Sequence, residues 1–417
     1  MNARVNGKGC DNVRGKKDIL FLLQFFYPEY VSSATLPYDT ATELVSEGFQ
    51  VDALCGYPHE YTEKVNVPCK ENVNGINVKR VRYLQLSRKK AIGRIVNYLS
   101  FTIAMFLRFF SMRKYKTIMV YSNPPILPLV AAFASKIFKS NLVFVAYDLY
   151  PEIALKTNAL SNGSVVNRLM NFINKFVFKQ ASAVVVLSTE MKDHVVHNRN
   201  IVDDKVYVIP NWYKDDYQTD LQKENNTFSE LVSNRFVVGY FGNMGVAQDM
   251  DIIKESILHF KNQYDICFVL SGHGSKHSEI EELIETNDIK NVYLYDFLHG
   301  QDYLDALTIS NCAIVTLEKG LTGLCVPSKT YGFMMQGLPI IAVMDESDIV
   351  CDIRQGAGYH IEDNSPQKLV EVIEFLKDNP KECFRSGQIS REIYLEKYMP
   401  KCCLSQYVKL LKQILEV

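Results

Sequence analysis

Residues Gly323–Ala342, GLCVPSKTYGFMMQGLPIIA, contain the order of elements that decides the fold of this 417-residue chain. The stretch reads as a tight loop, a helix that opens at Pro327-Ser328-Lys329, and an apolar strand from Pro339. Backbone N–H groups in the first turn of a helix lack partners within the helix, and the helix dipole favours negative charge there. A serine and a lysine at that turn therefore predict a phosphate site.

The same alternation of short apolar strands and amphipathic helices extends over both halves of the chain. The expected strands are Ile19–Leu23, Gln50–Cys55, Val78–Arg82, Thr117–Tyr121, Leu142–Tyr147, Ala183–Leu187, Lys205–Ile209, Phe236–Phe241, Ile266–Ser271, Val292–Tyr295, Ala313–Leu317 and Pro339–Val343. The expected helices include Thr40–Glu47, Val165–Gln180, Asp249–Phe260 and Leu404–Leu415. Strands rich in Val, Ile and Phe with helices between them predict the α/β class, with parallel, doubly wound sheets.

The length of the chain exceeds what one hydrophobic core usually supports, so two domains are expected. A polar segment poor in aliphatic residues, 213–234, is the predicted linker. It divides an N-terminal domain, 1–212, from a C-terminal domain, 235–397, and the terminal helical segment 398–417 can cross back to the N-terminal domain. Ligands in such sheets bind at the carboxyl ends of the strands, so the site is expected where the two domains face each other.

Composition narrows the class of protein. Apolar residues make up 47% of the chain, charged residues 22%, and the formal net charge is −1, values typical of a soluble globular protein without a nucleic-acid partner. Ten scattered cysteines without a CxxC or Cys/His pattern favour reduced thiols in a cytoplasmic protein, with no metal centre and no cofactor. The short apolar run near the N-terminus lacks a small-residue cleavage site and is read as a first strand.

The charge distribution is uneven, because the 76 positions between Glu71 and Asp148 hold no acidic residue and thirteen basic ones. Within this zone Ile95–Leu107 is apolar on nearly every side; it is short of the roughly 20 residues of a membrane span but can lie in a bilayer interface. Its basic surroundings would be drawn to anionic lipid, and include Arg88, Lys89, Lys90, Arg94, Arg108, Arg113 and Lys114. The alternative is a buried core helix with solvated ends. The long acid-free zone favours a peripheral protein on the inner face of the cell membrane.

Two further loops follow strands of the C-terminal half and carry glycines at a strand-to-helix turn. Gly242-Asn243-Met244-Gly245 lets the backbone approach a ligand, and Gly272–Lys276 repeats the pattern without the third glycine of a dinucleotide fingerprint. With Ser328-Lys329, three such loops in one domain point to one anionic ligand. Asp249 and Asp251 have a spacing that could hold Mg²⁺, but the more economical interpretation is that they cap a helix.

In the N-terminal half, FVAYDLYPEIAL places Asp148 and Glu152 after a strand, as the first acids beyond the basic zone. A carboxylate there could orient a sugar hydroxyl or assist proton transfer. The alternative interpretation is a helix N-terminus with its capping acid.

Eight short segments in this order resemble glycosyltransferase family 4, the retaining GT-B enzymes, and in particular its bacterial O-antigen and capsule branch with the N-acetyl-L-fucosamine transferases. The segments cover nearly the whole chain: FFYPEYVSSAT (25–35), SNPPILPL (122–129), AYDLYPE (146–152), VVVLSTEM (184–191), VIPNW (208–212), FGNMGVAQDMD (241–251), SGHGSKHSEIEEL (271–283) and VPSKTYGFMMQGLPIIA (326–342).

The resemblance implies two Rossmann-like domains facing across a cleft, with the donor site in the C-terminal one. It implies that a nucleotide diphosphate-sugar is bound by Gly242, Asn243, Gly245, Gln248, Gly272, Gly274, Lys276, Ser328, Lys329 and Thr330, and that Asp148 and Glu152 face the sugar and the acceptor. The activity implied is retaining, metal-independent transfer from a donor, expected to be UDP-linked and to carry an N-acetylated amino sugar, to a glycan on polyprenyl diphosphate.

The chain departs from the family pattern at three single positions and in the loop Tyr30–Thr35, which has serines where glycines are usual. Two glutamates usual across the opening loop are Leu324 and Gly332 here, and a histidine common before the Asp148 position is Tyr147. The residues at Leu324 and Gly332 keep open the alternative of a non-catalytic partner that binds a nucleotide-sugar. A UDP-sugar 2-epimerase, which shares the two-domain fold, is a second alternative.

Overall fold

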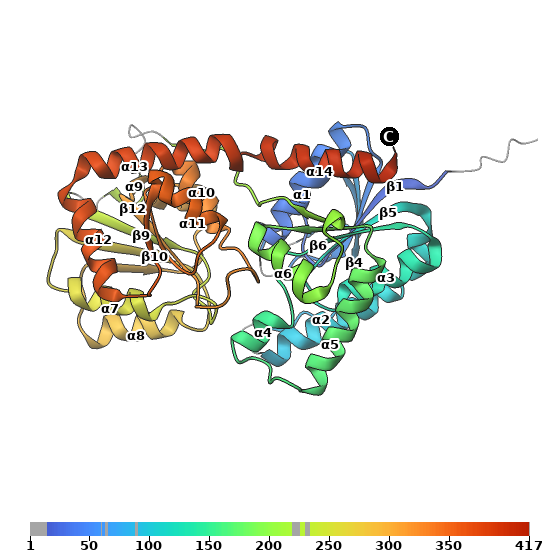
Figure 1. Cartoon of the computed structure of the whole chain (residues 1–417), viewed down its shortest axis with the longest axis horizontal. Helices are drawn as coiled ribbons and strands as arrows, with labels where there is room; N and C mark the ends of the chain where they lie inside the picture. The colour runs from blue at the N-terminus through green and yellow to red at the C-terminus, as the bar shows by residue number, and fades with distance from the viewer. Residues whose placement is uncertain are drawn as a thin grey trace, which may run out of the picture.

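The computed structural model describes residues 15–59, 61–62, 66–87, 91–218, 226–229 and 234–416 (Figure 1). Two separate sheets organise these residues. The first has the strand order β3-β4-β2-β1-β5-β6-β7-β8 and the second the order β11-β10-β9-β12-β13-β14. Their strand pairs run parallel, apart from the antiparallel hairpin of β3 with β4.

The first sheet uses the N-terminal half of the chain. Its strands are β1 Lys17–Leu22, β2 Val51–Gly56, β3 Lys70–Val73, β4 Ile76–Val81, β5 Tyr115–Tyr121, β6 Asn141–Val145, β7 Ala183–Val186 and β8 Val206–Val208. The helices between them are α1 Ser32–Ser46, α2 Ala91–Phe106, the 3-10 helix η1 Phe109–Lys114, α3 Leu127–Phe138, α4 Glu152–Lys156, α5 Val165–Gln180 and α6 Thr189–Arg199.

The second sheet uses the C-terminal half. Its strands are β9 Phe236–Phe241, β10 Ile266–Ser271, β11 Val292–Tyr295, β12 Cys312–Thr316, β13 Ile340–Val343 and β14 Gly358–Ile361. The helices are α7 Asp251–Phe260, α8 His277–Thr286, α9 Gly300–Ile309, α10 Lys329–Gln336, α11 Asp348–Asp352, α12 Pro366–Asp378, α13 Pro380–Ile393 and α14 Pro400–Leu415.

The twelve expected strands are all present, with ends that differ by a residue or two, and two strands were missed. β3 is a polar hairpin strand whose side chains are mostly exposed, so no apolar alternation reveals it. β14 is a four-residue edge strand, GYHI, preceded by a π-helical turn. The helix expected at Thr40–Glu47 begins earlier, at Ser32, and accommodates Pro37 within it. The helix expected from Asp249 begins at Asp251.

Helices cover both faces of the first sheet. On one face Phe101 and Met105 of α2 share a buried cluster with Ile173 and Val177 of α5. On the opposite face α1 packs together with the C-terminal helix α14, whose Tyr407 is buried in the same cluster as the strands. α14 is far from this sheet in sequence, and Figure 1 shows the C-terminal helices running from the second sheet across to the first.

α14 is tied to the N-terminal half by polar contacts as well. Lys412 pairs with Glu47 at 2.6 Å, and the amide of Asn141 donates to the carbonyl of Ile414 at 3.3 Å. Trp212, the only tryptophan, lies edge-on against Tyr407 and donates to the Asp39 carboxylate at 3.0 Å. The end of the chain is therefore part of the N-terminal core.

Candidate active site

The two glycine loops of the C-terminal half begin side by side, because Phe241 at the end of β9 is in register with Ser271 at the end of β10. The N–H of Gly242 donates to the carbonyl of Ser271 at 2.8 Å. A Cβ at Gly272 or Gly274 would lie 1.8 or 2.4 Å from the backbone of the neighbouring loop. These two glycines are therefore explained by the contact between the loops.

The first loop is held in shape by its own polar groups. The side-chain oxygen of Gln248 accepts from the N–H of Gly245 at 3.2 Å, and a Cβ at Gly245 would lie 3.0 Å from the Asn243 side chain. The Lys276 ammonium donates to the Gln248 carbonyl and to the Glu318 carboxylate, both at 3.1 Å. Lys276 thus clamps this loop and is already paired with a carboxylate.

Lys329, the first residue of α10, differs from Lys276 because it is not paired with a carboxylate in the described part of the chain. Its ammonium is buried, and no described residue accepts a hydrogen bond from it. It lies 3.6 Å from the centroid of the Tyr240 ring, and its side chain passes 3.5 Å from the position that a Cβ on Gly242 would take. Burial lowers the pKa of Lys329 to about 7. An anion beside Lys329 would satisfy this ammonium.

The residues on either side of Lys329 have different surroundings. The amide of Asn211, from the N-terminal half, donates to the Ser328 hydroxyl at 2.9 Å, so this helix start touches both halves of the chain. The Thr330 hydroxyl is fully buried and donates to the Pro327 carbonyl at 2.7 Å. Thr330 therefore fixes the first turn of α10, the Ser328 hydroxyl also donates to the Val326 carbonyl at 3.5 Å, and the Lys329 ammonium is the group of the three without a hydrogen-bond partner among the described residues.

Asp148 lies where the two halves of the chain meet. The N–H of Leu149 donates to the Leu324 carbonyl at 2.9 Å, and Asp148 forms an isolated antiparallel bridge with Cys325. No described residue donates a hydrogen bond to its carboxylate, and burial raises the pKa of Asp148 to about 6. The structure thus brings Asp148 to the loop that precedes Ser328 and Lys329.

Glu152 is in a different situation from Asp148. Its carboxylate forms an ion pair with Arg199 and lies 3.4 Å from Nε2 of His194, both on α6. Burial on its own would raise the pKa of Glu152, but the hydrogen bond from His194 and the charge of Arg199 hold the pKa below its ordinary value. Glu152 is therefore an ionised partner of α6, and the two acids of this loop have separate surroundings.

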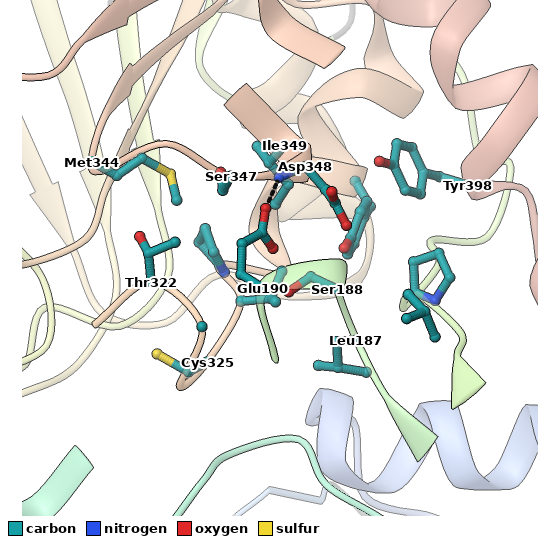
Figure 2. Close-up of a pocket in the computed structure, with 16 residues that line it drawn as sticks. Leu187, Ser188, Glu190, Thr322, Cys325, Met344, Ser347, Asp348, Ile349 and Tyr398 are labelled. Atoms are coloured by element: carbon teal, nitrogen blue, oxygen red, sulfur yellow. Dashed lines mark hydrogen bonds between the residues drawn. The ribbon is translucent and has the colours of Figure 1, made fainter. Parts of the chain in front are cut away.

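A cavity that the sequence reasoning missed lies between the halves, close to Asp148, with about 430 Å³ of empty space that is partly open to solvent. The helices α6 and α11 point their N-termini at each other across it. The N–H of Thr189 donates to the Asp348 carboxylate at 2.7 Å, and the N–H of Asp348 donates to the Glu190 carboxylate (Figure 2). Each helix start is thus capped by an acid from the opposite half of the chain.

The sequence did carry a signal for this pair. Ser188 and Ser347 cap their own helices, accepting from the N–H groups of Met191 and Val350 at 3.3 and 3.2 Å. A serine before an acid at a helix start indicates a capped N-terminus. That the two starts would meet depends on the arrangement of the two sheets, which no local pattern encodes.

Of the three single positions that depart from the family pattern, two are buried and Tyr147 is partly buried. Leu324 is buried, and Tyr147 lies against Tyr121 in the N-terminal core. A Cβ at Gly332, on α10, would lie 2.7 Å from the hydroxyl of Tyr303 and 3.4 Å from the Tyr213 ring. The space that a glutamate side chain would need at position 332 is therefore filled by aromatic side chains.

The predicted membrane helix presents apolar side chains to solvent. On α2 and just after it, exposed residues recur three or four positions apart, namely Ile92, Ile95, Leu99, Ile103, Phe106 and Phe110. Arg94, Arg108, Arg113 and Lys114 are exposed around this apolar stripe, whereas Arg88, Lys89 and Lys90 lie outside the described residues. The interpretation of α2 as a fully buried core helix is therefore wrong.

Two negative observations apply to the described part of the chain. No helix there is both long and apolar enough to cross a membrane. Nor do its His, Cys, Asp and Glu side chains form a group of three suited to a metal ion. Asp249 accepts from the N–H of Ile252 at 3.3 Å and from the Asn364 amide at 2.7 Å, while Asp251 pairs with Lys254.

Comparison of the sequence with known proteins found one matching family model and a related glycosyltransferase. Residues 34–212 match the glycosyl transferase 4-like domain. The chain is 24% identical over 302 residues, 70% of its length and 74% of the relative, to the probable glycosyltransferase WbjE of Pseudomonas aeruginosa.

Solved structures give the same result for the fold. Sucrose-phosphate synthase from Thermosynechococcus elongatus superposes with a TM-score of 0.74 at 14% identity, covering 96% of this chain and 100% of that one. Anabaena HepE in complex with UDP-glucose superposes with a TM-score of 0.72 at 15% identity, covering 95% and 100%. The predicted α/β class with two Rossmann-like domains is confirmed. The chain has the GT-B fold, its residues 34–212 match the glycosyl transferase 4-like domain, and it is a glycosyltransferase.

Proposed function

We propose that this chain is a retaining, metal-independent glycosyltransferase that moves a sugar from a UDP-sugar to a lipid-linked glycan of a bacterial surface polysaccharide. An N-acetylated amino sugar is the proposed sugar, by the resemblance to N-acetyl-L-fucosamine transferases. The observation that carries the donor half of this proposal is the unpartnered ammonium of Lys329 at the start of α10.

The argument for a diphosphate at Lys329 rests on the cost of burial. A buried charged group without a partner is destabilising, and native structures seldom leave one unsatisfied. Lys329 is the first residue of α10, and the helix has no acidic residue in its first turn, so its N-terminus favours negative charge. An anion bound there would meet both the ammonium charge and the positive end of the helix dipole.

The choice of UDP is supported by a relative of the same fold. HepE was solved with UDP-glucose and with UDP, at 15% and 14% identity to this chain. The proposed donor contacts are Gly242 beside Lys329, with Asn243, Gly245 and Gln248 shaping the loop and Ser328 at the helix start. Lys276 and the glycines Gly272 and Gly274 position this loop from the neighbouring strand.

On the acceptor side, Asp148 is the proposed catalytic carboxylate. Burial raises the pKa of the neighbouring Tyr150, the charge of Asp148 adds to this effect, and the charge of Arg94 opposes it. Arg94 lies on the exposed first half of α2, so that helix approaches the Asp148 loop. A lipid-linked acceptor lying along the apolar stripe of α2 could therefore present its sugar to Asp148. Glu152, paired with Arg199, is proposed to hold the loop and α6 together.

The proposed reaction breaks the bond between the anomeric carbon and the leaving phosphate oxygen, and forms a bond from that carbon to the acceptor oxygen on the same face. The proton of the acceptor hydroxyl passes to an oxygen of the leaving diphosphate. Charge that develops on the diphosphate is stabilised by Lys329 and by the N-terminus of α10, which are fixed before the reaction begins. Asp148 orients the acceptor hydroxyl.

The donor proposal is tested by a thermal-shift titration against UDP, GDP, ADP and dTDP, without metal and then with Mg²⁺. A ligand that binds only the folded chain at a hundred times its dissociation constant adds about 2.7 kcal/mol of stability. We expect a shift with UDP that does not need Mg²⁺. The absence of a shift with every nucleotide would contradict the donor site.

The reaction is tested with UDP-sugars and short polyprenyl diphosphate-linked acceptors, followed by NMR of the product to read the anomeric configuration. Transfer with retention is the expected result. Formation of a free epimerised UDP-sugar without an acceptor would instead identify a 2-epimerase, and UDP binding without turnover of any acceptor would favour a binding partner.

A further inference from the structure

Beside the end of α2, two adjoining hollows of about 950 and 920 Å³ of empty space, open to solvent, follow the edge strand β3 and its neighbour β4. α2 and η1 form their other wall. Besides the buried Arg80, five cations line them: Lys70, Lys79, Arg82, Arg108 and Lys114. We call this surface the edge groove.

The edge groove has an excess of positive charge. Its two carboxylates are already engaged: Asp52 accepts from Lys17 at 2.7 Å and from the Tyr115 hydroxyl at 2.7 Å, and Glu71 pairs with the buried Arg80 at 2.5 Å. The other five lining cations pair with no carboxylate of the described residues. The groove therefore offers several ammonium and guanidinium groups to an anion.

Lys79 shows that these cations act on one another. Partial burial lowers its pKa, and the charges of Arg108, Lys70 and Lys114 lower it further. A bound anion would relieve this repulsion, whereas a neutral or cationic ligand would not. Like charges gathered at one place without counter-charges favour an anion of more than one oxygen, such as a phosphate group.

The wall of the groove is continuous with the exposed apolar stripe of α2. Leu107 lines the groove and is 77% exposed, and Phe106 and Phe110 beside it are 58% and 73% exposed. Exposed aromatic and aliphatic side chains next to a cationic groove match a bilayer surface, in which acyl chains lie next to phosphate headgroups. A small soluble anion would leave these apolar side chains exposed to water.

We propose that the edge groove binds the phosphate headgroup of an anionic membrane lipid, while the apolar side chains of α2 and η1 enter the bilayer interface. This inference rests on the membrane association in the proposed function and adds a defined lipid site to it. A headgroup site in the groove would differ from a general attraction of basic residues to a charged surface, because only the groove would recognise individual headgroups.

The test compares vesicle binding of three proteins by co-sedimentation, using phosphatidylcholine vesicles with and without phosphatidylglycerol. The groove variant is Lys79→Gln/Arg108→Gln. The control is Lys175→Gln/Lys179→Gln, which removes the same charge from exposed residues of α5 in the same helical layer but outside the groove. Thermal melts and the UDP shift of each variant confirm that the fold and the donor site are intact.

We expect the groove variant to lose at least tenfold more affinity for phosphatidylglycerol vesicles than the control variant does. Equal losses in the two variants would overturn the groove as a site, while leaving membrane association in place. No binding of the unaltered chain to phosphatidylglycerol vesicles would overturn both membrane association and the groove, but not the donor proposal.

A second measurement separates a lipid headgroup from free phosphate. If inorganic phosphate at matched ionic strength stabilises the unaltered chain and not the groove variant, while both bind vesicles equally, the lipid assignment is wrong. Loss of vesicle binding in the groove variant, with no stabilisation of either protein by inorganic phosphate, supports it.

Discussion

Helix N-termini meet the interdomain region in two ways in this molecule. α6 and α11 are each capped twice, by their own serine and by an acid from the opposite half of the chain. α10 has no side-chain cap and no acid in its first turn, and a buried, unpartnered ammonium lies at its first residue. The first pair satisfies its own N–H groups and charges, so it needs no ligand. At the start of α10 the N–H groups of Thr330 and Tyr331 donate to backbone carbonyls, but the buried Lys329 ammonium has no hydrogen-bond partner among the described residues, which is the condition of a binding site. The helix N-terminus alone does not distinguish these cases; the partners around it do.

The largest effect of a substitution is expected at Lys329, at the N-terminus of α10. Lys329→Met removes the charge that would meet the diphosphate, so we expect a loss of at least about 100-fold in kcat/KM, in line with removal of one preorganised electrostatic contact. The UDP thermal shift should disappear, while the apo protein keeps or gains stability because a buried charge is lost.

Lys276→Met is the matched control for that variant, since Lys276 is already paired with Glu318. It should reduce UDP binding less than Lys329→Met does. Equal effects of the two substitutions would break the distinction between the paired and the unpaired lysine.

Asp148, which contacts the loop before α10, should make the activity depend on pH. Its pKa is about 6 in the folded chain against about 3.9 when unfolded. If the carboxylate orients the acceptor, kcat/KM should rise as the pH increases through about 6, and this rise should vanish in Asp148→Asn together with about tenfold or more of the activity.

The same residue makes a stability prediction with a definite sign. Between pH 4 and 6 the folded chain holds the Asp148 proton more tightly than the unfolded chain, so the free energy of unfolding falls as the pH rises through this range. Urea melts of the unaltered chain and Asp148→Asn should show this slope only in the former. An identical slope in both would mean that another group titrates.

Gly332→Ala tests whether the space beside α10 at position 332 is filled by Tyr303. The added Cβ would lie 2.7 Å from the Tyr303 hydroxyl, and overpacking of this kind costs about 1–3 kcal/mol. Tyr303→Phe in the same chain should recover most of the loss in urea melts. A Gly332→Ala variant as stable as the parent chain would show that Tyr303 moves aside freely.

The smallest effect is expected at the capped termini. Glu190→Ala and Asp348→Ala each remove one cap, typically worth about 1 kcal/mol. Because the caps are reciprocal, the double variant should differ measurably from the sum of the single variants. Glu382→Ala, which removes an exposed pair with Arg385, is the control and should cost almost nothing.

Local patterns in the sequence predicted most of the fold. Buried strands such as Phe236–Phe241 are continuous apolar runs, and α5 begins and ends where its cap and periodicity place it. The strands β3 and β14 were missed because their sequences, KENV and GYHI, contain no run of apolar residues. The other two edge strands, β8 and β11, keep such a run in VYV and VYLY and were predicted.

The candidate site was only partly predictable. The glycine loops and Lys329 stood out because each follows a strand, but the sequence could not show that Lys276 is paired and Lys329 is not. That difference depends on Glu318, whose position relative to Lys276 comes from packing of distant loops. In the same way, Asp148 and Glu152 looked alike in sequence, and only the contact of Glu152 with α6 separates them.

The path of α14 has a consequence for how this protein is made. Residues 400–415 complete the buried cluster under α1, yet they leave the ribosome after both sheets have been synthesised. Until then the N-terminal half exposes the apolar surface that Leu404, Tyr407 and Leu411 later cover. The two halves of the chain therefore do not mature in order of synthesis, and the first half is the more exposed to aggregation and to chaperones during that interval.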